Sequence, residues 1–497
     1  MFAAAILSIV LVPVSYPHSP PATQFEQAIT VYKSGKLSEA KQLFQQYQKT
    51  HPKDALTLSY LGLISLQQRD YSSALPLLKK AAQLQPSRPD AYINLGNAYD
   101  GLKKYTEAVQ SFQKAISLKP NSVSAYYDLA GIFYEMKKWP DAVAAYRKAA
   151  SLSPKDPDIQ NNYGVALQAA GNLGSAITAY RNACRLMPAN SSYEMNLGLA
   201  ALSLARKDQE KGSSTAAPIW DQARHAFAAA VKYSPADYTS REIYAETLAE
   251  IGHDDLAVTQ FEKAIALRPN VARPHLMLGM ALTRMNLYSK AIPSLKRTLV
   301  IEPYNIAALK LLGFDQFKLA RYGDAVLTYR QLIKLTPKDM AAWNNLGAAL
   351  QQSGDIDDAL ATINETGKLQ GEGPQLASLH RAAGYIYLKK GDADSLKMAR
   401  EEYLLAVKEN SQDASSYNGL GQVAQKEGKL EEALADFQKA VSVNPKFSDA
   451  FNNEGVIYER KGDDTQAIAA YRKALTISPT NVTARANLNR LARTSGK

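Results

Sequence analysis

Residues 89–120 read PDAYINLGNAYDGLKKYTEAVQSFQKAISLKP, and this stretch decides the fold. Tyr92, Gly96 and Tyr99 recur at helical spacing, so they predict one face of a first helix. The segment 101–105 that follows supplies a turn. The first half of the stretch therefore predicts a helix followed by a tight turn.

The second half predicts a second helix that folds back on the first. Ala108, Phe112 and Ala115 share one face of it, and Pro120 stands where the helix cannot continue. Gly96 and Ala108 are small, which predicts that the two helices cross closely at these positions. A single hairpin of this kind buries only one of its sides, so similar hairpins must stack to close a core.

The same pattern returns along the chain with a period of 34 residues. The prolines that end second helices make two regular series and a final pair: Pro52, Pro86, Pro120, Pro154 and Pro188, then Pro235, Pro269, Pro303 and Pro337, then Pro445 and Pro479. An alanine stands twelve residues before each of them, and a glycine stands twelve residues before many of those alanines. Three interleaved series at one period predict an all-α solenoid.

This spacing resembles the tetratricopeptide repeat (TPR) family: an aromatic residue, Leu-Gly, a second aromatic residue, then Ala-x-x-x-Phe/Tyr, Ala and Pro. The resemblance covers about residues 21–481, where 34-residue units give about 13 repeats. It implies a right-handed superhelical solenoid of helix-turn-helix repeats.

We predict four segments. Residues 21–373 would hold repeats 1–10, with an insertion at about 205–220 in repeat six and a degenerate tenth repeat. Residues 374–481 would hold repeats 11–13, and 482–497 would form a C-terminal capping helix with a polar outer side.

Residues 1–20 are the remaining segment. Phe2 to Val14 is mostly apolar, which is shorter than the roughly 20 residues that cross a bilayer but suits the core of a signal peptide. No Lys or Arg precedes this run, which argues against a signal peptide. We expect a signal peptide or a short N-terminal anchor, and export to the periplasm or cell envelope, with a cytoplasmic protein as the alternative. Membrane contact would occur only through this segment, if it is uncleaved.

The sequence offers little for catalysis or metal binding. The six histidines are far apart and Cys184 is the single cysteine, so no zinc spacing occurs. No known catalytic or nucleotide-binding motif is present. The net charge of +11 is spread along the chain and not gathered into a nucleic-acid footprint. We expect no catalytic residue, cofactor, metal, small-molecule substrate or nucleic acid, and therefore no enzyme.

The resemblance also implies a binding surface, because in TPR proteins the first helix of each repeat lines a concave groove for partners. Many inward positions here are asparagine, similar to the asparagine ladder in the repeats of O-linked N-acetylglucosamine transferases, although the transferase domain is absent. An amide side chain both donates and accepts, which suits a peptide backbone. The predicted partner-binding residues are Asn94, Asn97, Asp100, Tyr127, Asp128, Asn161, Asn162, Asn196, Asn344, Asn345, Asn418, Asn452 and Asn453. The alternative is that these asparagines only cap or bridge neighbouring helices.

The sequence thus favours a non-catalytic scaffold that binds extended segments of partner proteins in envelope or secretion-related assembly. Two other functions stay open: a subunit that recruits substrates to a separate enzyme, and a nucleic-acid-associated regulator, suggested only by the positive charge.

Overall fold

The computed structural model describes residues 23–354, 356–366 and 373–494, which form 27 helices and no strand. The fold is therefore all-α, as the sequence predicts. The chain divides into two compact units, residues 1–247 and 248–497, and each is described by itself. The predicted leader, residues 1–20, lies outside the described residues.

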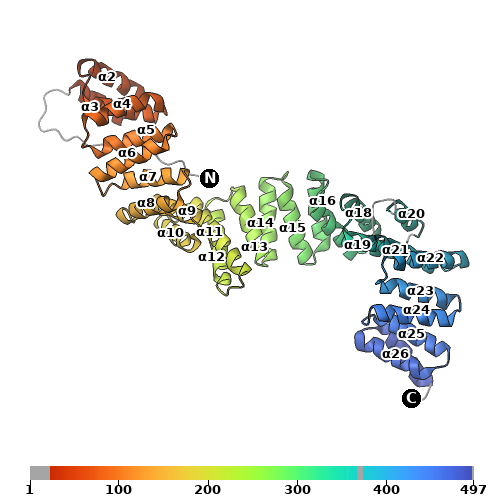
Figure 1. Ribbon diagram of the computed structural model, residues 1–497. Helices are drawn as coiled ribbons and strands as arrows, with labels where there is room; N and C mark the ends of the chain where they lie inside the picture. The colour runs from red at the N-terminus through yellow and green to blue at the C-terminus, as the bar shows by residue number, and fades with distance from the viewer. Residues whose placement is uncertain (1–22, 355, 367–372, 495–497) are drawn as a thin grey trace. The chain divides into compact units, whose positions relative to one another are not determined.

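The first unit is a stack of antiparallel helical hairpins (Figure 1). Its helices are α1 (Gln24–Lys33), α2 (Leu37–Thr50), α3 (Ala55–Gln67), α4 (Tyr71–Leu84), α5 (Pro89–Gly101), α6 (Tyr105–Leu118), α7 (Val123–Glu135), α8 (Trp139–Leu152), α9 (Pro157–Ala169), α10 (Leu173–Leu186), α11 (Ser191–Glu210) and α12 (Ala216–Tyr233). The boundary between the units falls within α13 (Tyr238–Glu250).

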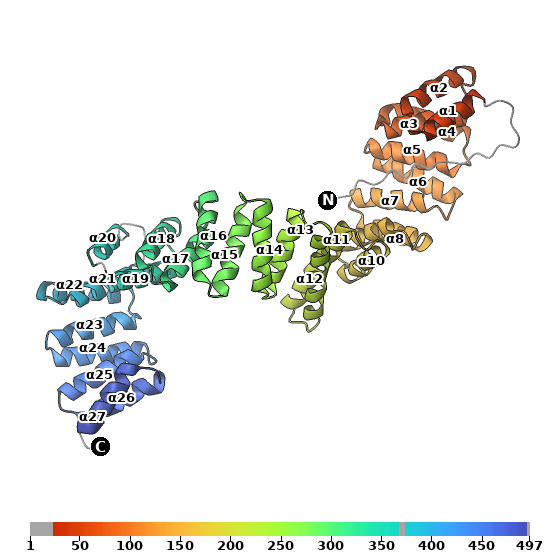
Figure 2. The same cartoon turned by 180° about the vertical axis from the view of Figure 1, so that it is seen from behind.

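The second unit repeats this arrangement, and Figure 2 shows the same order of hairpins from behind. Its helices are α14 (Asp254–Leu267), α15 (Ala272–Arg284), α16 (Tyr288–Ile301), α17 (Ile306–Lys318), α18 (Tyr322–Leu335), α19 (Met340–Ser353), α20 (Ile356–Thr366), α21 (Pro374–Lys390), α22 (Ala393–Glu409), α23 (Ala414–Lys426), α24 (Leu430–Val443), α25 (Ser448–Arg460), α26 (Asp464–Ile477) and α27 (Val482–Thr494).

The α5–α6 hairpin shows why the small residues recur. A Cβ added to Gly96 would lie 2.7 Å from the ring of Phe112, so only glycine allows this approach. Phe112 and Ala108 are fully buried at the crossing. Gly164 meets Tyr180 in the same way in the α9–α10 hairpin. The repeating pair of glycine and large side chain therefore fixes how each first helix lies on its second helix.

The turn inside the hairpin differs in detail from the sequence-based interpretation. Gly101 ends α5, and a Cβ there would lie 2.2 Å from the ring of Tyr71, so its role is close packing. The left-handed turn residue is Lys103, with φ 57°. Other hairpins place glycine at this point, for example Gly171 with φ 79°.

The insertion in the sixth repeat lengthens both helices of its hairpin. α11 has 20 residues and α12 has 18, whereas α9 has 13 and α10 has 14. Only the segment 211–215 lies between them, and the indole of Trp220 donates a 3.0 Å hydrogen bond back to Gln209. The added residues therefore extend the hairpin as paired helices.

The tenth repeat departs from the pattern. A Cβ on Gly347 of α19 would meet the backbone oxygen of Ser378 on α21 at 3.2 Å, and no side chain of α20. Leu346 and Ala382 are buried in one core cluster with Leu379 and Ile386 of α21. α21 therefore covers the face of α19 that a regular second helix covers elsewhere.

The last helix closes the described part of the second unit. Leu491 of α27 is buried in a cluster with Ala467 and Tyr471, and Leu488 packs against it. No helix within the described residues is long and apolar enough to cross a membrane. The repeat count, the segment boundaries and the right-handed superhelix stay predictions.

Candidate partner-binding face

The first helices of the hairpins carry all thirteen predicted binding residues, and we call the side that holds them the inner face. On α7, α9 and α11 it carries a chain of hydrogen bonds, which we call the N-terminal ladder. Asn196 Nδ2 donates to Asn161 Oδ1 at 2.8 Å, and Asn161 Nδ2 donates to Asn162 Oδ1 at 3.1 Å. Asn162 Nδ2 then donates to the hydroxyl of Tyr127 at 2.5 Å. The ladder thus ends at Tyr127.

A second chain, the C-terminal ladder, joins α23, α25 and α27. Asn487 Nδ2 donates to Asn452 Oδ1 at 2.9 Å, and Asn452 Nδ2 reaches Asn453 Oδ1 at 3.4 Å. Asn453 Nδ2 donates to Asn418 Oδ1 at 2.8 Å. Bridging between neighbouring helices, which the sequence left open as an alternative, is thus present at both ladders.

Both ladders follow one geometric rule. Each bond between repeats joins residues 35 positions apart, one more than the repeat length, as in Asn196 with Asn161 and Asn453 with Asn418. Tyr193 follows it as well, because its hydroxyl donates to Asp158 at 2.5 Å. In both ladders, a bridge between repeats thus requires a suitable side chain 35 residues before or after the asparagine.

Asn94 and Asn97 on α5 lack such a partner. Both are almost fully buried, with 3% and 5% of their surface exposed. Asn94 Oδ1 and Asn97 Nδ2 nevertheless have no hydrogen-bond partner among the described residues. The residue 35 positions before Asn94 is Ser59, whose short hydroxyl donates to its own helix at the Ala55 carbonyl.

The other predicted residues are not brought into either ladder. Asn344 and Asn345 are exposed on α19, where Asn344 accepts a hydrogen bond from the hydroxyl of Ser378. Asp128 is buried on α7. Asp100 is half-buried at the end of α5.

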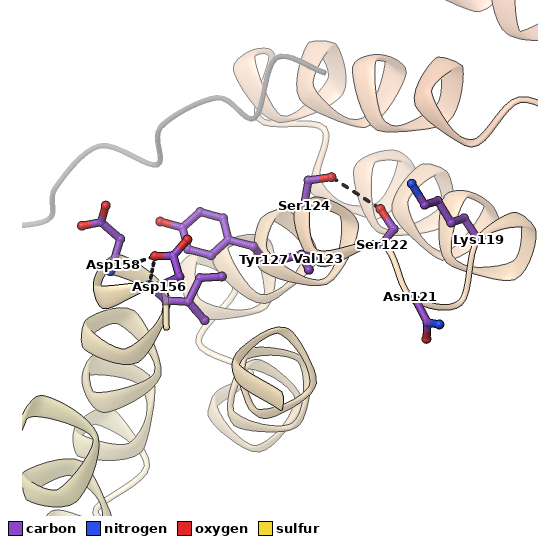
Figure 3. Close-up of a pocket in the computed structure, with 9 residues that line it drawn as sticks. Lys119, Asn121, Ser122, Val123, Ser124, Tyr127, Asp156 and Asp158 are labelled. Atoms are coloured by element: carbon purple, nitrogen blue, oxygen red, sulfur yellow. Dashed lines mark hydrogen bonds between the residues drawn. The ribbon is translucent and has the colours of Figure 1, made fainter. Parts of the chain in front are cut away.

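A pocket of about 500 Å³ lies on this face where α7 and α9 begin. Asp156, Asp158 and Tyr127 line one end of it, while Lys119 lies at the other (Figure 3). Burial, with Asp158 and Asp128 nearby, raises the pKa of Tyr127 to about 12. The hydroxyl therefore stays protonated at neutral pH in a negative environment.

A second acidic pair, Asp100 and Glu135, lies where α5 and α7 end. Burial, followed by the charge of Glu135, raises the pKa of Asp100. Glu135 and Asp100 also add to the raised pKa of Tyr105 after burial. Carboxylates thus lie at the C-terminal ends of α5 and α7 and at the N-terminal end of α9.

The sequence-based choice missed Asp156, Asp158, Tyr193 and Asn487. Asp158 occupies the second position of its repeat, one of the inward positions implied by the resemblance, so the register alone could have found it. Tyr193 and Asn487 follow from the spacing of 35, which becomes visible only once the stagger between neighbouring hairpins is known.

The described residues give no support for metal binding or for a reactive thiol. Within the described ranges, no group of three or more His, Cys, Asp or Glu residues could hold a metal ion. Burial raises the pKa of the Cys184 thiol, with Glu194 adding to the shift, which keeps the thiol protonated at neutral pH.

Stacked helical hairpins whose first helices carry polar side chains on one face are typical of helical-repeat interaction proteins. Profiles of the tetratricopeptide repeat match residues 25–89, 89–122, 131–171, 220–272, 311–368 and 418–482, more than half of the chain. The chain belongs to the tetratricopeptide repeat family, whose members mediate protein–protein interactions and scaffolding.

Several solved structures are similar to this chain. The C-terminal part of a TPR repeat-containing protein from Cytophaga hutchinsonii is 16% identical, covering 51% of this chain and 99% of that chain, with a TM-score of 0.44. Yeast Tom70 is 17% identical over 90% of this chain and 97% of that chain, with a TM-score of 0.36. Cut9–Hcn1 of the APC/C is 16% identical over 94% and 96%, with a TM-score of 0.34. No curated protein sequence gives a significant match.

Proposed function

We propose that this protein is a non-catalytic scaffold that binds extended segments of partner proteins along the inner face of its first helices. The observation that carries the proposal is the pair of buried, unpaired amide atoms on α5, Asn94 Oδ1 and Asn97 Nδ2. One is an acceptor and the other a donor, which are the two groups that a peptide backbone complements.

A buried polar atom without a partner costs about 1–3 kcal/mol of free energy. A bound segment that supplies one N–H and one C=O would recover that cost when the two side chains turn to expose these atoms. The residues of the N-terminal ladder would contribute differently, because their bonds hold α7, α9 and α11 in register beside the unpaired amides. Affinity would then accumulate over several repeats, at about 1 kcal/mol for each net hydrogen bond.

We place this role in envelope or secretion-related assembly. The support is the apolar run from Phe2 to Val14, which has the length of a signal-peptide core. Fusing the chain to a reporter that is active only in the periplasm tests the placement. Reporter activity confined to the cytosol would contradict it.

Affinity capture with partner identification tests the binding role. The test variant carries Asn94→Ala, Asn162→Ala and Asn196→Ala, and its folding is checked by circular dichroism. The matched control replaces three exposed asparagines in turns, Asn172, Asn270 and Asn444, by alanine. We expect the test variant to lose the partners that the wild type and the control retain. If the folded test variant keeps every partner, the proposed binding face is wrong.

A further inference from the structure

Four carboxylates lie on or beside α5, α7 and α9 although the chain as a whole is basic. The formal net charge is +11, yet Asp100, Glu135, Asp156 and Asp158 all lie on α5, α7 and α9 or at their ends. No Lys or Arg within the described part of the chain makes an ion pair with any of these four carboxylates. Their charge is therefore available to a cation from outside the chain.

The pocket at the start of α7 and α9 places two of these carboxylates next to apolar side chains. Val123, Ile159 and the ring of Tyr127 provide apolar walls, and the carboxylates of Asp156 and Asp158 stand at one end (Figure 3). A lysine or arginine side chain matches this arrangement, because its aliphatic stem can contact the apolar walls and its charged tip can reach the carboxylates. At about 500 Å³ the pocket has room for such a side chain.

The carboxylates are held in place by the protein itself. Asp156 Oδ1 accepts hydrogen bonds from the backbone N–H groups of Asp158 and Ile159, at 3.0 and 3.1 Å, and so caps α9. Asp158 accepts the hydroxyl hydrogen of Tyr193 at 2.5 Å. A fixed carboxylate loses little freedom when a cation binds, which favours binding.

The unpaired amides on α5 are an observation independent of the charge. Asn94 stands at the same repeat position as Asp128 on α7 and Asn162 on α9, one residue after the position of Tyr127. The three helices follow one another in the stack. α5 contacts α7, and both α7 and α9 pack against α8. The unpaired atoms lie on α5, and the acidic pocket lies between α7 and α9, so one extended segment along the three helices would meet both.

We infer that the inner face of α5, α7 and α9 binds an extended protein segment that carries Lys or Arg, with the cationic side chain in the Tyr127–Asp158 pocket. The backbone of the segment pairs with Asn94 and Asn97. This inference rests on the proposed function and adds the charge class of the partner to it.

Three fluorescein-labelled peptides of equal length test the inference by fluorescence anisotropy with the full chain. They alternate Thr with Lys, with Gln or with Glu. We expect the Lys peptide to bind at least about tenfold more tightly than the Gln peptide, and the Glu peptide not to bind. Non-specific attraction would give the opposite order, because the protein carries a net positive charge.

The variant Asp156→Asn/Asp158→Asn separates the pocket from the rest of the face. Asparagine still caps a helix, so α9 should stay folded. We expect the Lys peptide to lose about tenfold in affinity and the Gln peptide to be unaffected. The matched control, Asp141→Asn/Asp324→Asn, changes the net charge equally at exposed positions in the first turns of α8 and α18 and should leave both affinities unchanged.

The outcomes distinguish this inference from the proposed function. One outcome is that the Lys and Gln peptides bind equally, with an affinity that Asn94→Leu weakens and the pocket variant does not change. That result contradicts the cationic partner but still supports the proposed binding face. Binding of the Lys peptide that the control variant weakens as much as the pocket variant also overturns the inference. If no peptide binds and partner capture does not depend on the inner asparagines, both fail.

Discussion

The two asparagine ladders are built alike but have different neighbours. In each, one asparagine pair within a first helix is joined to the helices before and after it, through Asn161 and Asn162 on α9 and through Asn452 and Asn453 on α25. The N-terminal ladder ends at Tyr127, which lines the acidic pocket, and the helix that carries Tyr127 contacts α5 with its unpaired amides. The C-terminal ladder runs from Asn418 to Asn487 on the last helix, next to the buried carboxyl of Glu454.

The comparison of the bridged asparagines with the unpaired ones shows that an asparagine on the inner face is not by itself a binding residue. Where the partner position is filled, the amide bridges two helices and contributes to stability. Where it is not, as at Asn94 and Asn97, the amide keeps a buried polar atom without a partner. We therefore propose that a peptide binds on α5, α7 and α9, and that the C-terminal ladder only bridges its helices.

The largest effect on stability is expected from breaking the centre of a ladder. Asn161→Ala removes the acceptor of Asn196 and the donor to Asn162, so the free energy of unfolding should fall by about 2 kcal/mol. Urea unfolding followed by circular dichroism measures it. Asn452→Ala should cost a similar amount but leave peptide affinity unchanged. A cost below about 0.5 kcal/mol for both would show that the ladders do not stabilise the stack.

Asn94→Leu should behave in the opposite way. Replacing a buried, unpaired amide by an apolar side chain of similar size removes a desolvation cost, so stability should stay the same or rise by about 1 kcal/mol. The affinity for the peptides described above should fall. The same urea and anisotropy measurements decide this. A clear loss of stability would mean that Asn94 has a structural partner after all.

Tyr193→Phe should have a smaller effect. It removes the hydrogen bond to Asp158 and nothing else of comparable strength, so the free energy of unfolding should fall by about 1 kcal/mol. Asp158 would also be held less firmly, which should weaken binding of the Lys peptide but not of the Gln peptide. Unchanged discrimination between the two peptides would show that Tyr193 does not position this carboxylate.

The smallest expected effect is a change in how stability depends on pH, and it comes from Glu454 beside the C-terminal ladder. Burial raises the pKa of Glu454 to about 7, above its ordinary value of 4.5, so the folded state holds the proton more tightly than the unfolded state. This contribution to stability is complete below pH 4.5 and is lost as the pH rises through 7.

Glu454→Gln should therefore flatten the fall in stability between pH 5 and pH 8, as measured by urea unfolding at each pH. Some slope should remain, because burial also raises the pKa of Asp315 to about 6. Asp449→Asn on the same helix is the control. A variant with the full wild-type slope would show that Glu454 does not titrate in this range.

Much of the fold follows from the sequence because its determinants are local. Gly96, Ala108 and Phe112 define the hairpin crossing through spacing alone, and the structure confirms it. The tenth repeat was visible as degenerate, but the way α21 covers Gly347 was not, because this depends on which helix fills a space that α20 leaves.

Less of the site follows from the sequence. Asn94 and Asn161 look alike in a sequence, and only the stagger of 35 residues between neighbouring hairpins reveals that one is bridged and the other is not. The pocket depends on the same stagger, since Tyr127 and Asp158 come from different repeats. The residue types predicted which side chains lie on the inner face. The geometry then showed which asparagines bridge two helices and which are unpaired.

The most direct measurement of the central claim is photo-crosslinking from the Lys peptide. The peptide carries a diazirine side chain at its centre, and crosslinked sites on the full chain are mapped by mass spectrometry. We predict crosslinks within α5, α7 and α9 that disappear in the Asn94→Leu variant and persist in Asn452→Ala. Crosslinks to α6, α8 or the C-terminal ladder, unaffected by Asn94→Leu, would contradict the account.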